Sequence, residues 1–160
     1  MIKFQPIGLI HTPFDDIEGM PIQPTGAKGI CGTIEVYEEY IPGLLDLEGF
    51  SHIILLYHLH EVKSSALVVT PFLDSNEHGI FATRAPKRPN PIGFSVVKLN
   101  TIQGQILQIE NVDMLNDTPL IDIKPYLPEF DQHAVDRLGW YEAVQGKVQT
   151  HRSDSRFRKE

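Results

Sequence analysis

The chain of 160 residues carries 14 Lys and Arg side chains against 21 Asp and Glu, which gives a formal net charge of −7 and a sequence pI of about 5.4. The 41% of hydrophobic and 22% of charged residues are typical of a folded globular protein and exclude a disordered or fibrous chain. The longest apolar run, residues 53–57, is far shorter than the roughly 18 residues that a transmembrane helix requires.

Cys31 is the only cysteine, so the sequence allows no internal disulfide and no cysteine-rich zinc site. The N-terminal residues lack the apolar core and the small-residue cleavage site of a signal peptide. We therefore expect a cytoplasmic protein, in which Cys31 is a buried structural thiol rather than a nucleophile.

The predicted elements are mostly short strands. Residues 7–14 indicate a strand followed by an extended loop. Strand-like apolar patterns then follow at residues 30–37, 52–60, 66–71, 94–102, 106–112 and 120–123. Gly104 lies between two of these runs and predicts a hairpin turn. Helical patterns are weak and confined to residues 40–47 and 130–138, and the 12 prolines and 12 glycines break any long helix. The pattern favours a β-barrel or sandwich over a doubly wound α/β sheet.

The acidic charge is unevenly distributed along the chain. Residues 78–109 contain Arg84, Lys87, Arg88 and Lys98 and no carboxylate, a net charge of +4, whereas residues 1–77 carry a net charge of −8. Because phosphate binding relies on Lys and Arg, the basic stretch is a candidate anion-binding face. A chance gap in the surface carboxylates is the alternative.

The basic stretch contains the segment FATR, residues 81–84, and the loop RPNPIG, residues 88–93. The two prolines stiffen this loop, which lowers the entropic cost of binding a ligand. The guanidinium groups of Arg84 and Arg88 suit phosphate or carboxylate, and Asn90 supplies both a donor and an acceptor. A rigid barrel connection with solvated arginines explains the same residues equally well.

Two further pairs of polar residues follow predicted strands. Asp122 and Lys124 point to the same face of a strand, either as a structural ion pair or as part of a polar site. His58 and His60 also share a face, but no third ligand lies at a supporting spacing. We therefore expect no metal site, and a histidine that hydrogen-bonds a ligand or the backbone.

Five segments together resemble the TsaA-like (TrmO) family of S-adenosylmethionine-dependent tRNA methyltransferases. They are IGLIHTPF, PIQ, GLLDLEGFSHIILLYHLHE, FATRAPKRPNPIGFSVVKL and DTPLIDIKPYLPEFD, and they occur in the family's order. The glycine-rich and P-loop fingerprints of common nucleotide sites are missing, as are the HExxH and GxSxG motifs.

The resemblance implies a mainly β, single-domain β-barrel with short peripheral helices over residues 1–148, followed by a charged flexible tail, residues 149–160. The resemblance further implies that this barrel binds S-adenosylmethionine without a Rossmann sheet, and that it forms a homodimer with the cofactor pocket near the subunit contact. The implied reaction is methylation of N6 on the threonylcarbamoyl-modified adenosine at position 37, beside the tRNA anticodon. No membrane or DNA partner is implied. Many bacterial members carry a C-terminal domain that this sequence lacks.

The resemblance also places site residues. Cofactor contacts are expected at Pro21, Ile22, Gln23, His60, Glu61, Arg84, Leu99, Asn116, Asp117, Thr118 and Pro119. Arg88, Asn90 and the run from Asp122 to Tyr126 are expected in the same cleft. Two positions depart from the family pattern: Ile22 stands where arginine is common, and Asn116-Asp117 replaces Asp-Gly. Asp tolerates the left-handed backbone that glycine favours better than most residues do.

The chemistry suggests roles for these residues. The adenine N6 lone pair is delocalised into the ring, so we expect its attack to be accompanied by loss of a proton. Asp122 is the expected acceptor of that proton, or orients the acceptor, and Lys124 keeps Asp122 ionised. Asn90 holds the base edge and Tyr126 stacks on an adenine. Lys87 and Arg88 bind the anticodon-loop phosphates, so tRNA binding is expected to be weak, salt-sensitive and concentrated on one face.

Two alternatives remain open at this point. The acceptor is instead a small molecule or another nucleic acid, or the chain is a non-catalytic β-barrel that senses S-adenosylmethionine or reads RNA.

Overall fold

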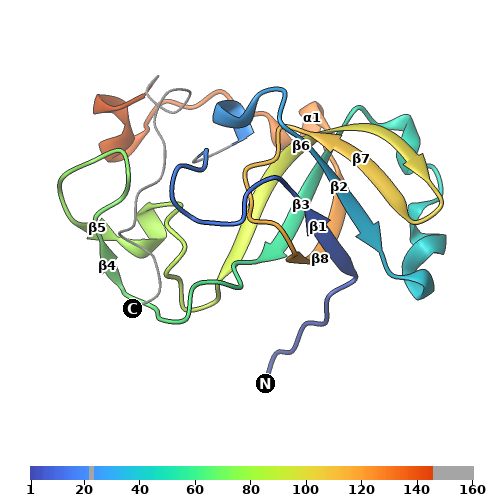
Figure 1. Ribbon diagram of the computed structural model, residues 1–160. Coiled ribbons are helices and arrows are strands. Elements are labelled where there is room, and N and C mark those ends of the chain that lie inside the picture. The colour runs from blue at the N-terminus through green and yellow to red at the C-terminus, as the bar shows by residue number, and fades with distance from the viewer. Residues whose placement is uncertain (22–23, 146–160) are drawn as a thin grey trace.

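The computed structural model describes residues 1–21 and 24–145, and six of its strands close into an antiparallel barrel (Figure 1). Around the barrel their order is β1, β2, β7, β6, β3, β8. Their bounds are β1 Gly8–His11, β2 Cys31–Val36, β3 His52–His58, β6 Ile92–Gln103, β7 Ile106–Glu110 and β8 Thr118–Pro125. The expected mainly β barrel with short helices is confirmed.

Alternation of apolar and polar residues determines which side chains fill the barrel. Ile10, Ile34, Leu55, Val97 and Leu120 are all less than 1% exposed and come from five different strands. Each strand therefore contributes every second residue to one core, as expected of a half-buried sheet. The hairpin at Gly104 is confirmed as the β6–β7 turn, with a φ of 62° that glycine adopts without strain.

Cys31 is a correction to the sequence expectation, because it is exposed rather than buried. It begins β2, whose core-facing residues are Ile34 and Val36. The alternation of the strand therefore turns Cys31 outward, where its Sγ lies 3.7 Å from the carbonyl oxygen of Gly29.

The expected helix over residues 130–138 is wrong. Only α1, Pro128–Asp131, is helical there, with Pro128 at the start where its missing N–H costs no hydrogen bond. Phe130, Val135 and Leu138 are 67%, 65% and 37% exposed, so this segment has no apolar face to bury against the barrel. The expected turn of helix at residues 40–47 is instead the 3-10 turns Glu38–Leu44 and Leu47–Gly49.

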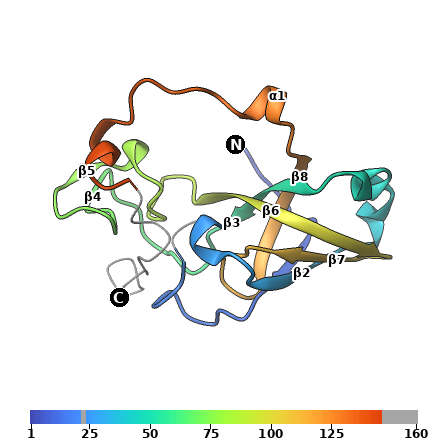
Figure 2. The ribbon, with the colours of Figure 1, turned by 90° about the horizontal axis from the view of Figure 1, so that it is seen from above.

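A small unit lies beside the barrel, built from the two-residue strands β4 Val68–Val69 and β5 His78–Gly79 and the 3-10 turn Ile80–Ala82. The chain passes α1 and returns to this unit, ending in the 3-10 turn Gly139–Ala143 (Figure 2). Trp140 fixes the return, because its ring stacks on His78 at 4.7 Å and its Nε1 donates to the carbonyl oxygen of Ala82 at 2.7 Å. The remaining described 3-10 turn is Pro24–Ala27.

No helix among the described residues is both long and apolar enough to span a membrane. Residues 22, 23 and 146–160 lie outside the described part of the chain, so the expected tail at 149–160 is not tested.

Candidate functional site

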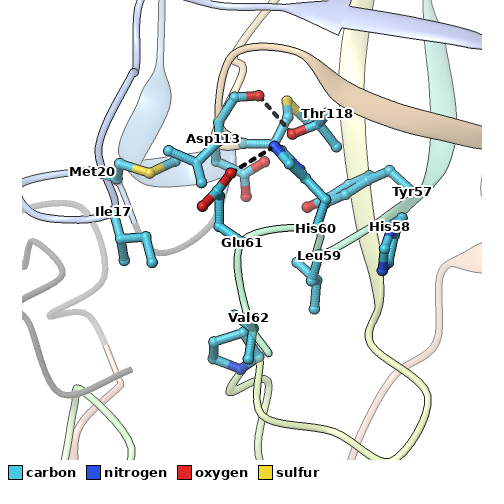
Figure 3. A pocket seen from close by; sticks show the side chains of 13 residues that line it. Ile17, Met20, Tyr57, His58, Leu59, His60, Glu61, Val62, Asp113 and Thr118 are labelled. Atoms are coloured by element: carbon cyan, nitrogen blue, oxygen red, sulfur yellow. Dashed lines mark hydrogen bonds and ion pairs between the residues drawn. The ribbon is translucent and has the colours of Figure 1, made fainter. Parts of the chain in front are cut away.

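A pocket lies at one end of the barrel, where β3 ends and the segment leading into β8 begins (Figure 3). These two strands are antiparallel neighbours, so the end of one meets the start of the other. The pocket, with the solvent space at its open mouth included, measures about 480 Å³. The lining side chains are mostly apolar with a few polar groups: Ile17, Met20, Tyr57, His58, Leu59, His60, Glu61, Val62, Pro86, Asp113, Met114, Leu115 and Thr118.

His60 and Glu61, both expected from the resemblance, lie in this pocket. Nε2 of His60 is 3.6 Å from Oε1 of Glu61. Nδ1 of His60 is buried without a hydrogen-bond partner, and among the described residues no other buried side-chain nitrogen or oxygen is in that state. Buried polar atoms are normally satisfied, so this nitrogen is available to a ligand or a water in the pocket.

Asp113 is a pocket residue that the sequence reasoning missed. Its Oδ1 accepts a 2.7 Å hydrogen bond from Ser95 Oγ, which in turn lies 2.8 Å from the hydroxyl of Tyr57. All three are buried. Burial raises the pKa of Asp113 to about 7, and it raises the pKa of Tyr57 well above its ordinary range. The sequence feature that could have indicated a buried acid here is the position of Asp113 between the apolar residues Val112 and Met114.

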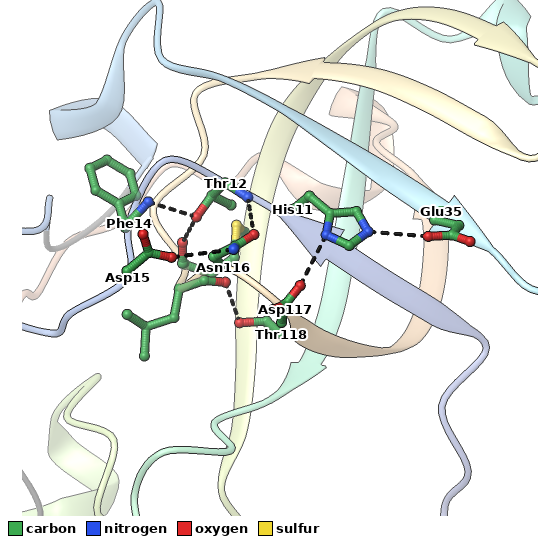
Figure 4. Close-up of polar contacts among 10 residues, drawn as sticks. His11, Thr12, Phe14, Asp15, Glu35, Asn116, Asp117 and Thr118 are labelled. Atoms are coloured by element: carbon green, nitrogen blue, oxygen red, sulfur yellow. Dashed lines mark hydrogen bonds and ion pairs between the residues drawn. The ribbon is translucent and has the colours of Figure 1, made fainter.

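The loop Asn116-Asp117-Thr118-Pro119 lies at the rim of the pocket, because Thr118 lines the pocket and the other three residues do not. Figure 4 shows the polar contacts of this loop. Asp117 has a φ of 60°, so aspartate adopts here the left-handed conformation that glycine usually supplies. Asn116 Oδ1 accepts a hydrogen bond from the Thr12 N–H at 3.1 Å. Thr118 Oγ1 donates to the carbonyl oxygen of Leu115 at 2.6 Å. Aspartate in place of the family's glycine at position 117 is therefore compatible with the left-handed turn of this loop.

His11 ties the same loop to the barrel wall. Its Nδ1 lies 3.1 Å from Oδ1 of Asp117 and its Nε2 lies 3.2 Å from Oε2 of Glu35 (Figure 4). The imidazolium form places an N–H at both carboxylates, whereas the neutral ring places one N–H only. The histidine thus links β1, β2 and the rim of the pocket.

Asp122 and Lys124 form an ion pair of 2.8 Å and do not line the pocket. A register shift at Leu56/Tyr57 places Leu120 opposite Tyr57 and Asp122 opposite Leu56. This bulge reverses the alternation of β8, so Leu120 and Ile123 both pack on the core while the side chains of Asp122 and Lys124 are 42% and 58% exposed. The carboxylate of Asp122 raises the pKa of Lys124.

The two arginines of the basic stretch, Arg84 and Arg88, have different surroundings. Nη1 of Arg88 donates to the carbonyl oxygens of Ile80, Thr83 and Ala85 at 3.2, 2.8 and 3.2 Å, so it holds the loop together. Arg84 is exposed, with its guanidinium carbon 5.6 Å from the ring centre of Phe94. Neither arginine lines the pocket, nor do Lys87 or Asn90.

The remaining expected site residues are more dispersed. Leu99 is 6% exposed inside the barrel core and does not line the pocket, and neither do Pro21, Pro119 and Tyr126. Ile22 and Gln23 lie outside the described residues. Around the pocket the structure brings together His60, Glu61 and the loop of Asn116 to Thr118, and within the described residues no group of three or more His, Cys, Asp or Glu could hold a metal ion.

Comparisons with known proteins agree on one family. Residues 9–132 match the family model described as the tRNA-methyltransferase O N-terminal domain. The chain is 53% identical, over 98% of its length and 85% of the relative's, to a Pyrococcus abyssi protein named as a probable S-adenosyl-L-methionine-binding protein. It is 34% identical, over 79% of its length, to the human tRNA (adenine(37)-N6)-methyltransferase, of which it covers 30%.

The crystal structure of TrmO from Pseudomonas aeruginosa superposes with a TM-score of 0.74 at 35% identity. It covers 88% of this chain, and the chain spans 62% of it. The match therefore lies in the barrel domain, and the chain belongs to the TrmO family.

Proposed function

We propose that the chain binds S-adenosylmethionine in the barrel-end pocket and transfers its methyl group to N6 of adenosine 37 in tRNA. The observation that carries the proposal is the convergence of His60, Glu61 and Thr118 on one pocket, because these three residues come from two distant family motifs. The names of the human and Pyrococcus relatives supply the reaction and the cofactor. We propose the threonylcarbamoyl-modified adenosine as the acceptor.

The pocket residues fit the cofactor. An apolar wall with two methionines suits the purine ring and the aliphatic carbons of S-adenosylmethionine, and the unpartnered Nδ1 of His60 offers one hydrogen bond. When bound, S-adenosylmethionine supplies an electrophilic methyl group. We assign contacts with the part of the cofactor that extends beyond this pocket to Pro21, Ile22, Gln23, Arg84, Leu99, Asn116, Asp117 and Pro119, because none of these residues in the described chain lines the pocket itself.

The proton of the acceptor nitrogen needs a base, and Asp122 is the proposed one. Its neighbour Lys124 lies at 2.8 Å and supplies a compensating positive charge. The pair lies on the outer face of β8, so the acceptor base approaches from outside the barrel. We propose that Asn90, beside the His58 end of β3, holds the edge of that base, and that Tyr126, beside the His52 end of β3, stacks on an adenine, either of the acceptor or of the cofactor.

The basic stretch binds the anticodon loop in this proposal. Arg84 is exposed, whereas Nη1 of Arg88 already donates hydrogen bonds to three backbone carbonyl oxygens. We therefore propose that Arg84 and Lys87 make most of the phosphate contacts. We further propose a cytoplasmic homodimer, with the pocket close to the contact between the subunits.

A second candidate is S-adenosylmethionine binding without transfer to tRNA, with a small molecule or no acceptor. The names of the Pyrococcus abyssi relative and of a second relative, 40% identical and from Archaeoglobus fulgidus, favour it, because both state binding only.

Incubation with methyl-labelled S-adenosylmethionine and tRNA, with and without the threonylcarbamoyl group, tests both candidates. Nucleoside mass spectrometry that finds the methyl group on modified adenosine 37 alone supports the first. Cofactor binding without a labelled nucleoside in either tRNA supports the second.

A further inference from the structure

Five ionisable side chains line the pocket: the two carboxylic acids Asp113 and Glu61, with Tyr57, His58 and His60. None of the lining residues in the described chain is Lys or Arg, and Glu61 has His60 as a neighbour at 3.6 Å. A buried carboxylate in a lining without Lys or Arg favours a cationic group over a neutral group of the same shape.

The carboxyl of Asp113 is fixed in place. Ser95 Oγ donates its hydrogen to Oδ1 of Asp113, so the Tyr57 hydroxyl donates to Ser95 Oγ at 2.8 Å. Asp113 is 9% exposed and Ser95 is 1% exposed, so the carboxyl is held between β3, β6 and the pocket. A fixed, poorly hydrated carboxyl responds strongly to charge placed beside it.

We propose that Asp113 makes the pocket selective for the cationic sulfonium of S-adenosylmethionine over the neutral thioether that remains after methyl transfer. The inference rests on the proposed function, because it takes the cofactor to occupy this pocket. The positive sulfonium stabilises the ionised carboxylate, whereas the thioether gives it no compensation. Product release is thereby favoured, with Asp113 acting as a specificity-determining residue.

Because the selectivity depends on the ionised form of Asp113, ligand binding is coupled to release of the Asp113 proton. Burial raises the pKa of Asp113 to about 7 in the free protein, so a cation that lowers this pKa on binding releases a proton near neutral pH. The titratable groups that line the pocket with Asp113 are Tyr57, His58, His60 and Glu61, and the charge of Arg84 acts on the neighbouring Tyr57. Affinity for the sulfonium therefore rises with pH up to about 7 and levels off above it, and affinity for the thioether lacks this component.

Isothermal titration calorimetry of the full chain measures the effect directly. S-adenosylmethionine and S-adenosylhomocysteine are titrated between pH 5.5 and 8.5, in buffers of different ionisation enthalpy that report proton release. We expect the affinity ratio of the two ligands to rise about tenfold or more across this range. In Asp113→Asn the ratio should be small and flat, while the matched surface variant Asp136→Asn should behave as the parent protein does.

Each outcome decides the inference. A ratio independent of pH in the parent protein, with no proton released on binding of the sulfonium, overturns it without need of a variant. An unchanged ratio in a folded Asp113→Asn protein overturns it as well. Absence of any S-adenosylmethionine binding to the parent protein instead overturns the proposed function. A pH-dependent ratio that Asp113→Asn abolishes supports both.

Discussion

Gly93 lies directly against the ring of Tyr57, and a Cβ atom at position 93 would overlap the Cζ, Cδ2 and Cε2 atoms of that ring. The two residues are opposite each other in the β3–β6 ladder. The glycine of RPNPIG therefore lets the Tyr57 ring lie inside the barrel, where its hydroxyl reaches Ser95 and, through Ser95, Asp113.

Gly93→Ala should destabilise the fold because Tyr57 cannot move without leaving the core. We expect a loss of about 1–3 kcal/mol in the free energy of unfolding, measured by urea denaturation. Gly79→Ala is the matched control, since no atom lies within 4 Å of a Cβ there and its φ is −60°. Equal stability of the two variants would contradict the steric explanation.

The free energy of unfolding should depend on pH through the carboxyl group of Asp113. Its pKa rises from an ordinary value of 3.8 to about 7 on folding, so the folded state holds this proton more tightly than the unfolded state. The contribution is present at acidic pH and is lost as the pH rises through about 7. Relative to Asp113→Asn, the parent protein should lose about 2–3 kcal/mol between pH 5 and pH 8.

Urea unfolding of both proteins at each pH isolates this contribution, because the other titrating groups cancel in the difference. Asp74 is one such group, since the hydrogen bond from His78 lowers its pKa and gives the opposite slope. A difference that does not change with pH would show that Asp113 titrates normally.

Asp122→Asn should slow methyl transfer while the affinity for S-adenosylmethionine stays the same. The change removes the proposed base and leaves the pocket intact, since Asp122 lies outside it. We expect a fall of about 10²-fold or more in the single-turnover rate on modified tRNA. Asp136→Asn, at a side chain that is 99% exposed, is the control. Unchanged turnover in Asp122→Asn removes this residue from the mechanism.

Alanine substitutions of the two arginines in the basic stretch should affect different properties, tRNA binding for Arg84 and stability for Arg88. Arg84→Ala should reduce the salt slope of tRNA binding by about one phosphate contact in a filter-binding titration, with little change in stability. Arg88→Ala should instead lower stability, because three carbonyl oxygens lose a charged donor. An unaltered salt slope in Arg84→Ala would argue against phosphate contact at that residue.

The strands were predictable because alternation along β2, β6 and β7 is a local property of the sequence. The position of Asp122 was not, since the bulge beside Tyr57 depends on how β3 and β8 meet across about 65 residues of chain. The role of Asp113 could not be predicted for a related reason. The sequence shows an acid in an apolar run, but only the folded chain shows that Ser95 lies beside it and donates a hydrogen bond to it. His60 and Thr118, which belong to two distant family motifs, line one pocket in the structure. Residues 57 and 95, which support that pocket, belong to none of the assigned contacts.

The closed order of the six strands has a consequence for association. Every barrel strand has a hydrogen-bonded neighbour on both sides, from β1 round to β8, but two ladders are short: β1 pairs with β8 only at Thr118, Pro119 and Leu120, and β7 pairs with β6 only from Lys98 onward. A closed barrel leaves a second copy only these short stretches of backbone for strand pairing. We therefore expect a dimer to bury mainly outward-facing side chains, such as Ile92 and Phe94 on β6, so that side-chain substitutions there change its affinity.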